Sequence, residues 1–168
     1  AFRASLAAQT GHFKEAMNLE PTGLRVSTPT GLRVSVNAFI LHDGKILLQR
    51  RSDNGNWNMP GGGVEIGESL ITALHREVFE ETGLLAQITR YIGVYSDPLE
   101  TTLSYPDGRV LHYIAHVLEC SVAGGTLQMD HESLELGWFD PHALPEPFSP
   151  QHRGRVADAV ERKDTVFR

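Results

Sequence analysis

The chain has 168 residues, 40% of them hydrophobic, and a net charge of −6 from 15 Lys and Arg against 21 Asp and Glu. This length and composition suit one domain with a hydrophobic core and do not require a second domain. The acidic balance lacks the basic stripe with which proteins neutralise long nucleic acids, so we expect no polymeric nucleic acid as a partner. Small phosphate compounds remain compatible with a local cation or metal.

The cysteine content and the hydropathy pattern bear on the cellular setting. Cys120 is the only cysteine, so no disulfide can form within the chain, which favours a cytoplasmic setting over secretion. Charged side chains interrupt the first twenty residues, and no stretch is long enough for a membrane-spanning helix. We therefore expect no targeting segment and no membrane partner.

The N-terminal segment, residues 1–32, is expected to form an arm or a short helix, with the helix at residues 4–19. A near-repeat follows, because residues 22–27 and residues 30–35 both have the sequence Thr-Gly-Leu-Arg-Val-Ser. It fits a duplicated extended arm or a short hairpin, and chance similarity in a linker fits equally well. The folded domain is expected to span residues 33–168.

The domain has alternating strand and helix patterns. Hairpin, cap and turn signals are His42-Asp43-Gly44, an N-cap at Ser69 and a helix-ending Gly83. In chain order, the patterns predict strands at residues 34–41 and 45–49, a glycine-rich loop at 61–67, a helix at 69–82, strands at 87–95, 110–120 and 134–139, and a helix at 151–162. This order predicts an α/β fold with a mixed sheet between helices.

The helix at residues 69–82 carries Glu77, Glu80 and Glu81, spaced i, i+3 and i+4. At about 100° per residue, these glutamates overlap the edge of the apolar arc, which is formed by Leu70, Ile71, Leu74 and Val78. A solvated acidic face would instead lie opposite the core. Like charges at this spacing cost about 0.2–0.5 kcal/mol per pair, and a hard divalent cation such as Mg²⁺ would offset that cost. We therefore favour a metal site over a solvated face.

The loop before this helix contains three consecutive glycines, Gly61, Gly62 and Gly63, which allow a backbone to approach metal or phosphate closely. Residues 62–69 also have the spacing of a P-loop. However, Glu68 stands where the phosphate-binding lysine belongs, and its negative charge would repel phosphate. This excludes the P-loop interpretation.

Loop and helix together form one motif. Its defined positions are Gly62, Glu68, Arg76, Glu77, Val78, Glu80, Glu81, Gly83 and Leu84. In residue types and spacing this stretch resembles the complete Nudix box, without a departure at any defined position. A chance match of this kind is expected in roughly one window in 10⁹. The resemblance extends over residues 33 to about 145 and excludes the N-terminal arm.

The resemblance implies a Nudix-like α/β/α sandwich that hydrolyses a diphosphate linkage with Mg²⁺, or with Mn²⁺ in its place. It implies that Glu77 and Glu81 are metal ligands, assisted by Glu80 and the Gly61 carbonyl. Arg76 is expected to orient the glutamates. The other box residues with a structural role are Gly62, Glu68 and Gly83, of which Glu68 either pairs with Arg76 or holds a water. The general base is left open between a helix glutamate and Glu132, which precedes the last predicted strand.

Candidate substrate-binding residues lie outside the box. Arg50 and Arg51 follow an apolar strand and are candidates for binding phosphate, although neighbours on a strand face opposite ways. Trp57 is a candidate for stacking on a base and equally for capping the core. We expect Asp97 and its neighbours, with the turn at residues 105–108, to line the specificity pocket.

These residues predict a Mg²⁺-dependent hydrolase of a nucleoside diphosphate linked to another moiety, such as a nucleotide sugar, ADP-ribose or a nucleoside triphosphate. The alternative is a catalytically idle Nudix domain that binds nucleotides or partner proteins. An intact box disfavours it, because a binding module does not need three close carboxylates. Residues 1–32 are candidates for exchange between the two copies of a homodimer.

Overall fold

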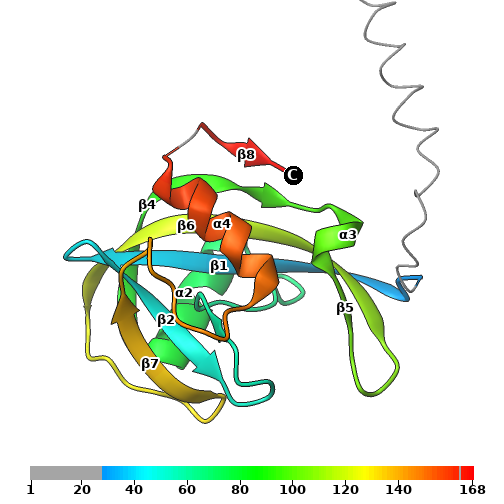
Figure 1. The fold of residues 1–168 in the computed structure, drawn as a ribbon, viewed down its shortest axis with the longest axis horizontal. Coiled ribbons are helices and arrows are strands. Elements are labelled where there is room, and N and C mark those ends of the chain that lie inside the picture. Colours follow the sequence, from blue (N-terminus) through cyan, green and yellow to red (C-terminus); the bar gives the residue numbers. More distant parts are fainter. Residues whose placement is uncertain (1–27, 163) are drawn as a thin grey trace, which may run out of the picture.

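The computed structural model describes residues 28–162 and 164–168, and Figure 1 gives the arrangement of their elements. The strands are β1 (Gly31–His42), β2 (Lys45–Arg51), β3 (Trp57–Asn58), β4 (Leu84–Tyr95), β5 (Thr102–Ser104), β6 (Val110–Gly125), β7 (Ser133–Phe139) and β8 (Val166–Phe167). The helices are α2 (Leu70–Thr82), α3 (Pro98–Thr101) and α4 (Pro150–Val160). The helix predicted at residues 4–19 and the first copy of the near-repeat lie outside the described residues.

Within the described residues, eight strands form one mixed sheet in the order β3-β2-β1-β6-β4-β8, with β5 paired to β6 and β7 paired to β2. The long parallel pair of β1 and β6 runs from Gly31 opposite Leu111 to Leu41 opposite Ser121. On the other side of β6 lies β4, antiparallel to it. Figure 1 shows β2 and β7 turned at an angle to these central strands. The mixed sheet expected from the sequence is confirmed.

The predicted hairpin between β1 and β2 is confirmed, with His42 opposite Lys45. Its two central residues, Asp43 and Gly44, have φ angles of 48° and 74°. Positive φ at both positions is the requirement of the tight hairpin turns that favour Asp-Gly, and it matches the twist of the flanking strands. The local sequence therefore fixes the register in which β2 returns along β1.

Helices cover both faces of the sheet and make the predicted sandwich (Figure 1). Alternate side chains of β1 separate the two cores, because Ala38 and Ile40 pack with α2 whereas Phe39 packs with α4. On the α2 face, the helix contributes Ala73, Leu74 and Val78. On the α4 face, the helix contributes Val156 and Ala159.

Both predicted caps of α2 are confirmed. The Ser69 hydroxyl accepts a hydrogen bond from the Thr72 backbone N–H, at 3.1 Å, and starts the helix. Gly83 ends the helix with a φ of 69° and donates its backbone N–H to the Phe79 carbonyl. The two caps fix where the helix begins and ends, and so they fix the position of its glutamates along the helix axis.

One residue of the predicted apolar arc is not part of the core, because Ile71 is 56% exposed. Its angle around the helix lies between those of Val78 and Thr82, and both of these are fully buried. Ile71 therefore lies on the buried side of the helix. It is exposed because it belongs to the first turn, which extends past the sheet. Angular projection alone does not reveal where a helix extends past the layer that it covers.

Replacement of Gly83 by Ala is expected to destabilise the protein. A Cβ there would overlap the Thr126 carbonyl oxygen, in addition to the cost of positive φ. The matched control is Gly108→Ala, because Gly108 has a φ of 86° with nothing within 4 Å of the added Cβ. We expect urea unfolding to give a loss of about 1–2 kcal/mol for the control and at least about 1 kcal/mol more for Gly83→Ala. Equal losses would contradict the steric contribution.

Candidate active site

Glu81 is the most deeply placed carboxylate of α2, with 5% of its surface exposed. One carboxylate oxygen accepts the Gly61 backbone N–H at 2.7 Å, and the other accepts the Gln49 side-chain amide at 2.8 Å. Burial raises the pKa of Glu81 to about 7, while the bonds from Gln49 and Gly61 act in the opposite direction. Glu81 lies at the inner edge of the glutamate cluster, as its place between two apolar positions of the helix predicted.

Gln49 and Ser133 are site residues that sequence reasoning missed. Both are buried, at 2% and 6% exposure, and the Ser133 hydroxyl donates to the Gln49 side-chain carbonyl at 2.9 Å. That bond sets the amide so that its NH₂ group points at Glu81. The sequence did contain one signal, because Gln49 is a polar residue at the end of a buried strand. A buried amide needs polar partners, so Gln49 could have been predicted to bond to a site residue.

Arg76 ties the outer glutamates together. Its guanidinium donates two hydrogen bonds of 2.9 Å to the Glu68 carboxylate, one of 2.8 Å to Glu77 and one of 3.2 Å to Glu80. It also donates to the Gly63 carbonyl at 3.0 Å. These bonds raise the pKa of Arg76, and Arg76 in turn lowers the pKa of Glu68. Of the two roles weighed for Glu68, the structure contains the ion pair.

The glycine loop packs too closely for side chains. A Cβ on Gly62 would lie 2.5 Å from the Glu77 carboxylate, and Gly61 has a φ of 135° against the backbone of Val36. The Pro60 and Gly62 carbonyls accept hydrogen bonds from β1, and the Gly61 N–H turns to Glu81. The loop therefore holds its backbone directly against two carboxylates of the helix.

A pocket of about 280 Å³ opens beside α2. We call it the acidic pocket. It is lined by Glu77, Glu80, Glu81, Asp130, His131 and Glu132. No Lys or Arg side chain is among these lining residues. Burial raises the pKa of Glu77, and the charges of Glu80 and Glu132 act in the same direction. Five carboxylates around one pocket are the oxygen donors that hard divalent cations prefer.

The carboxylates are not gathered as one ligand set in this conformation. In the described part of the chain, no three Asp, Glu, His or Cys side chains lie together as they would around one metal ion. Glu77 and Glu80 are instead bonded to Arg76, and Glu81 to Gln49 and Gly61. The donor chemistry fits a divalent cation, and binding would require the outer carboxylates to exchange Arg76 for the ion.

Of the two candidate arginines, Arg51 lies near the acidic pocket. The hydrogen bond to Asp53, 2.7 Å away, is the main cause of the raised pKa of its guanidinium, and the charges of Glu81 and Glu132 make the smallest contributions. Arg50 instead donates to the Gly55 carbonyl of its own loop at 3.1 Å. Neither arginine is among the lining residues of the acidic pocket, and the binding of phosphate by either one stays a prediction.

Two other candidates lie apart from the acidic pocket. Trp57 is 5% exposed and packs edge-on against Phe139, with ring centroids 4.7 Å apart, in the core beneath α4. This burial leaves little ring surface for a base. Asp97 caps α3, accepting the Leu99 N–H at 2.9 Å. The turn at residues 105–108 joins β5 to β6 and lines neither of the two pockets described for this chain.

The sandwich fold and the carboxylate helix define a class of hydrolase. Comparison of the chain with known proteins identifies its family. The family model of the NUDIX domain matches residues 31–159. A MutT-like protein of Streptomyces ambofaciens is 33% identical over 129 residues, covering 76% of this chain and 77% of that protein. The chain therefore belongs to the Nudix family.

Two further similarities concern proteins with named activities. An ADP-ribose pyrophosphatase of Methanocaldococcus jannaschii is 39% identical over 116 residues, which cover 67% of this chain and 64% of that protein. The crystal structure of a UDP-X diphosphatase superposes with a TM-score of 0.66 at 27% identity, covering 89% of this chain and 70% of that one. These similarities support a hydrolase that acts on pyrophosphate bonds.

The expectation of an enzyme is thereby confirmed, and hydrolases of this family generally use divalent metal ions. None of the helices in residues 28–162 and 164–168 combines the length and apolar character needed to cross a membrane.

The buried carboxyl of Glu81 predicts a pH-dependent stability of the metal-free protein. Its pKa of about 7 in the folded state exceeds the unfolded value of about 4.3, so between these values the folded state keeps a proton that the unfolded state has lost. The free energy of unfolding therefore falls as pH rises. With EDTA present, we expect wild type to lose about 2–3 kcal/mol between pH 4 and pH 8 relative to Glu81→Gln, measured by urea unfolding. Parallel curves would assign Glu81 an ordinary pKa.

Proposed function

We propose that the protein hydrolyses the diphosphate linkage of a nucleoside diphosphate joined to another moiety, with a divalent cation in the acidic pocket. The observation that carries this proposal is the set of five carboxylates around that pocket, with Glu81 buried at its inner side. Two similar proteins, named an ADP-ribose pyrophosphatase and a UDP-X diphosphatase, support substrates of this kind. The compounds to consider are nucleotide sugars, ADP-ribose and nucleoside triphosphates.

Glu77 and Glu81 would hold the cation, with Glu80 and the Gly61 carbonyl assisting. When bound, Mg²⁺ or Mn²⁺ neutralises the diphosphate and lowers the pKa of water towards ~7. The Pro60 and Gly62 carbonyls on either side of Gly61 accept hydrogen bonds from β1, which hold the loop backbone in place at Gly61. Gln49 and the Gly61 N–H hold Glu81 in place from two sides.

The remaining residues serve the substrate. Arg51, near Glu81 and Glu132, binds the phosphates. Water attacks one phosphorus atom, the bond to the bridging oxygen breaks, and the phosphate that leaves carries the electron pair. Glu132 accepts the proton of the attacking water, because it is exposed at the rim of the pocket and its carboxylate has no arginine partner among the described ion pairs. Arg76 holds Glu68, and it holds Glu77 and Glu80 until the cation replaces it at these two carboxylates.

The direct test is a hydrolysis screen of nucleotide sugars, ADP-ribose, dinucleoside polyphosphates and nucleoside triphosphates with Mg²⁺ and with Mn²⁺. Chromatography should detect a nucleoside monophosphate among the products of at least one compound. EDTA should abolish its formation. Binding of nucleotides without hydrolysis of any compound would instead support the catalytically idle module.

Substitution of the proposed ligands tests the site. Glu77→Gln and Glu81→Gln should each lower kcat/KM by at least about 100-fold, since each removes a charge that holds the cation. The matched control is Glu65→Gln, an exposed glutamate of the same loop that does not line the acidic pocket. It should retain wild-type turnover. Circular dichroism verifies that the variants are folded, and unchanged turnover in both ligand variants would overturn the assignment.

A homodimer is a separate part of the proposal, with residues 1–32 exchanged between the two copies. Sedimentation velocity of the full chain should then give a dimer, and a chain that begins at residue 33 should give a monomer. A full chain that sediments as a monomer at micromolar concentration would contradict the exchange.

We also infer a cytoplasmic location. It rests on the single cysteine, Cys120, which is buried and unpaired.

A further inference from the structure

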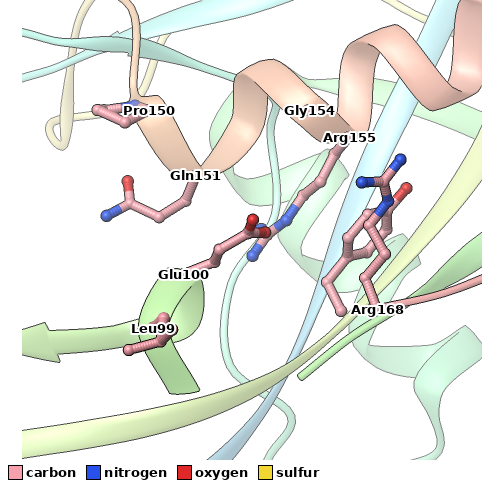
Figure 2. Close-up of a pocket in the computed structure, with 8 residues that line it drawn as sticks. Leu99, Glu100, Pro150, Gln151, Gly154, Arg155 and Arg168 are labelled. Atoms are coloured by element: carbon pink, nitrogen blue, oxygen red, sulfur yellow. The ribbon is translucent and has the colours of Figure 1, made fainter. Parts of the chain in front are cut away.

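The described residues include three buried acidic side chains, and Glu81 differs from the other two in its partners. Glu119 lies 2.8 Å from the Arg90 guanidinium, and Asp158 lies 2.8 Å from that of Arg168. Figure 2 shows Arg168 among the side chains that line a pocket of about 320 Å³ beside α4. By contrast, no ion pair of the described residues includes Glu81. Its two oxygens bond to the N–H groups of neutral amides.

Neutral donors orient the Glu81 carboxylate without cancelling its charge. Each carboxylate oxygen has two lone pairs, so the bonds from Gln49 and Gly61 leave a further lone pair on each oxygen. An arginine in place of Gln49 would also orient the carboxylate, but its positive charge would compete with a cation, as that of Arg76 does at Glu77. The amide therefore fixes this carboxylate and leaves its charge available to a metal ion.

The orientation of the Gln49 amide depends on Ser133. The Ser133 hydroxyl donates to the Gln49 side-chain carbonyl at 2.9 Å, and the amide nitrogen donates to Glu81 at 2.8 Å. An amide turned by 180° would place its carbonyl oxygen against the carboxylate, and two acceptors repel each other. Both residues are buried, so water does not replace either bond without cost. Ser133 therefore acts on Glu81 through Gln49.

A β-bulge in β7 brings Ser133 to this position. The pairing of β2 with β7 is regular as far as Arg50. It then passes over Leu134, so that Ser133 lies opposite Arg51. In a regular ladder Leu134 would lie opposite Arg51, and Ser133 would face the other side of the sheet. Leu134 is instead 54% exposed, while Ser133 reaches Gln49. Bulges of this kind redirect side chains next to active sites.

The same bulge fixes the backbone of Glu132, the residue before Ser133. The Ser52 N–H donates to the Glu132 carbonyl at 2.8 Å, which continues the shifted register by one residue. Glu132 and Glu81 both line the acidic pocket. The path from one to the other runs through the Ser133 hydroxyl and the Gln49 amide. The relative position of the two carboxylates therefore depends on two buried hydrogen bonds.

We propose that Gln49 and Ser133 are positioning residues of the reaction, which fix the metal-binding carboxylate of Glu81 relative to Glu132. This inference rests on the proposed function for the roles of Glu81 as a cation ligand and Glu132 as the base. It adds two residues that act on the chemistry without touching the substrate, and it gives the bulge at Leu134 a role.

Binding of Mn²⁺ to the full chain without substrate tests the inference, because it does not depend on turnover. Free Mn²⁺ is measured by electron paramagnetic resonance. Ser133→Ala should weaken Mn²⁺ binding about 10-fold and Gln49→Met at least as much, since hydrogen-bond partners of metal ligands typically contribute about 10–100-fold to affinity. Circular dichroism checks the fold, and Ser133→Ala alone decides the test if Gln49→Met does not fold. Wild-type affinity in Ser133→Ala would overturn the inference.

The double variant tests whether Ser133 acts through Gln49. With the amide already removed, the hydroxyl has no carbonyl to orient. Ser133→Ala combined with Gln49→Met should therefore bind Mn²⁺ about as tightly as Gln49→Met alone. Losses that multiply would show that the two side chains act independently, which contradicts the proposed path.

Turnover at saturating Mn²⁺ separates positioning from substrate binding. With a compound that wild type cleaves, Ser133→Ala should lower kcat about 10-fold and change KM by less than about 2-fold, because Ser133 does not line the acidic pocket. The matched control is Leu134→Ala, which alters an exposed side chain of the same bulge and removes neither hydrogen bond. It should match wild type in Mn²⁺ affinity and in kcat. A raised KM with unchanged kcat in Ser133→Ala would contradict a positioning role.

The failures of the two proposals are distinguishable. Weaker Mn²⁺ binding in Ser133→Ala, without hydrolysis of any compound by wild type, would support the positioning of Glu81 and overturn the proposed function. Hydrolysis that Glu77→Gln abolishes, with wild-type Mn²⁺ binding and turnover in Ser133→Ala, would overturn this inference and leave the proposed function in place.

Discussion

The pair of hydrogen bonds to the buried Glu81 carboxylate is the constraint on which the rest of the site depends. The carboxylate lies on α2, one donor comes from the glycine loop and the other from Gln49 on β2, which Ser133 of β7 holds in turn. Three segments therefore meet at the Glu81 side chain, and a fourth, β7, joins them through Gln49. A carboxylate withdrawn from water requires such partners, so the loop, the helix and both strands are positioned together.

Two pockets lie on opposite faces of the sheet, one beside α2 and the other beside α4. On the α2 side the lining residues of the pocket include no Lys or Arg, and on the α4 side the Arg155 guanidinium is buried beside the Tyr95 ring. The short segment from Met59 to Gly61 contacts both regions, through His152 on one side and Glu81 on the other.

The sequence predicted the elements with strong local signals. The hairpin at Asp43-Gly44, the caps of α2 and the inward position of Glu81 follow from turn preference, capping and helical periodicity. The short elements β3, β5, β8 and α3 were missed, because two to four residues carry no measurable periodicity. Gln49 and Ser133 were missed as partners of Glu81 because they are brought together by strand pairing across 84 residues of sequence. Ile71 was misassigned because projection ignores where a helix overhangs its sheet.

The parallel pairing of β1 with β6 also has a consequence for how the chain folds. Thr30 and Val110, at one end of this pair, are 80 residues apart in sequence, and the whole box lies between them. Closing so large a loop costs entropy before any contact compensates for it, and contacts of such high order slow folding. The box helix and its loop can form early from local signals. We therefore expect the pairing of β1 with β6, and not the formation of the box, to limit the rate of folding.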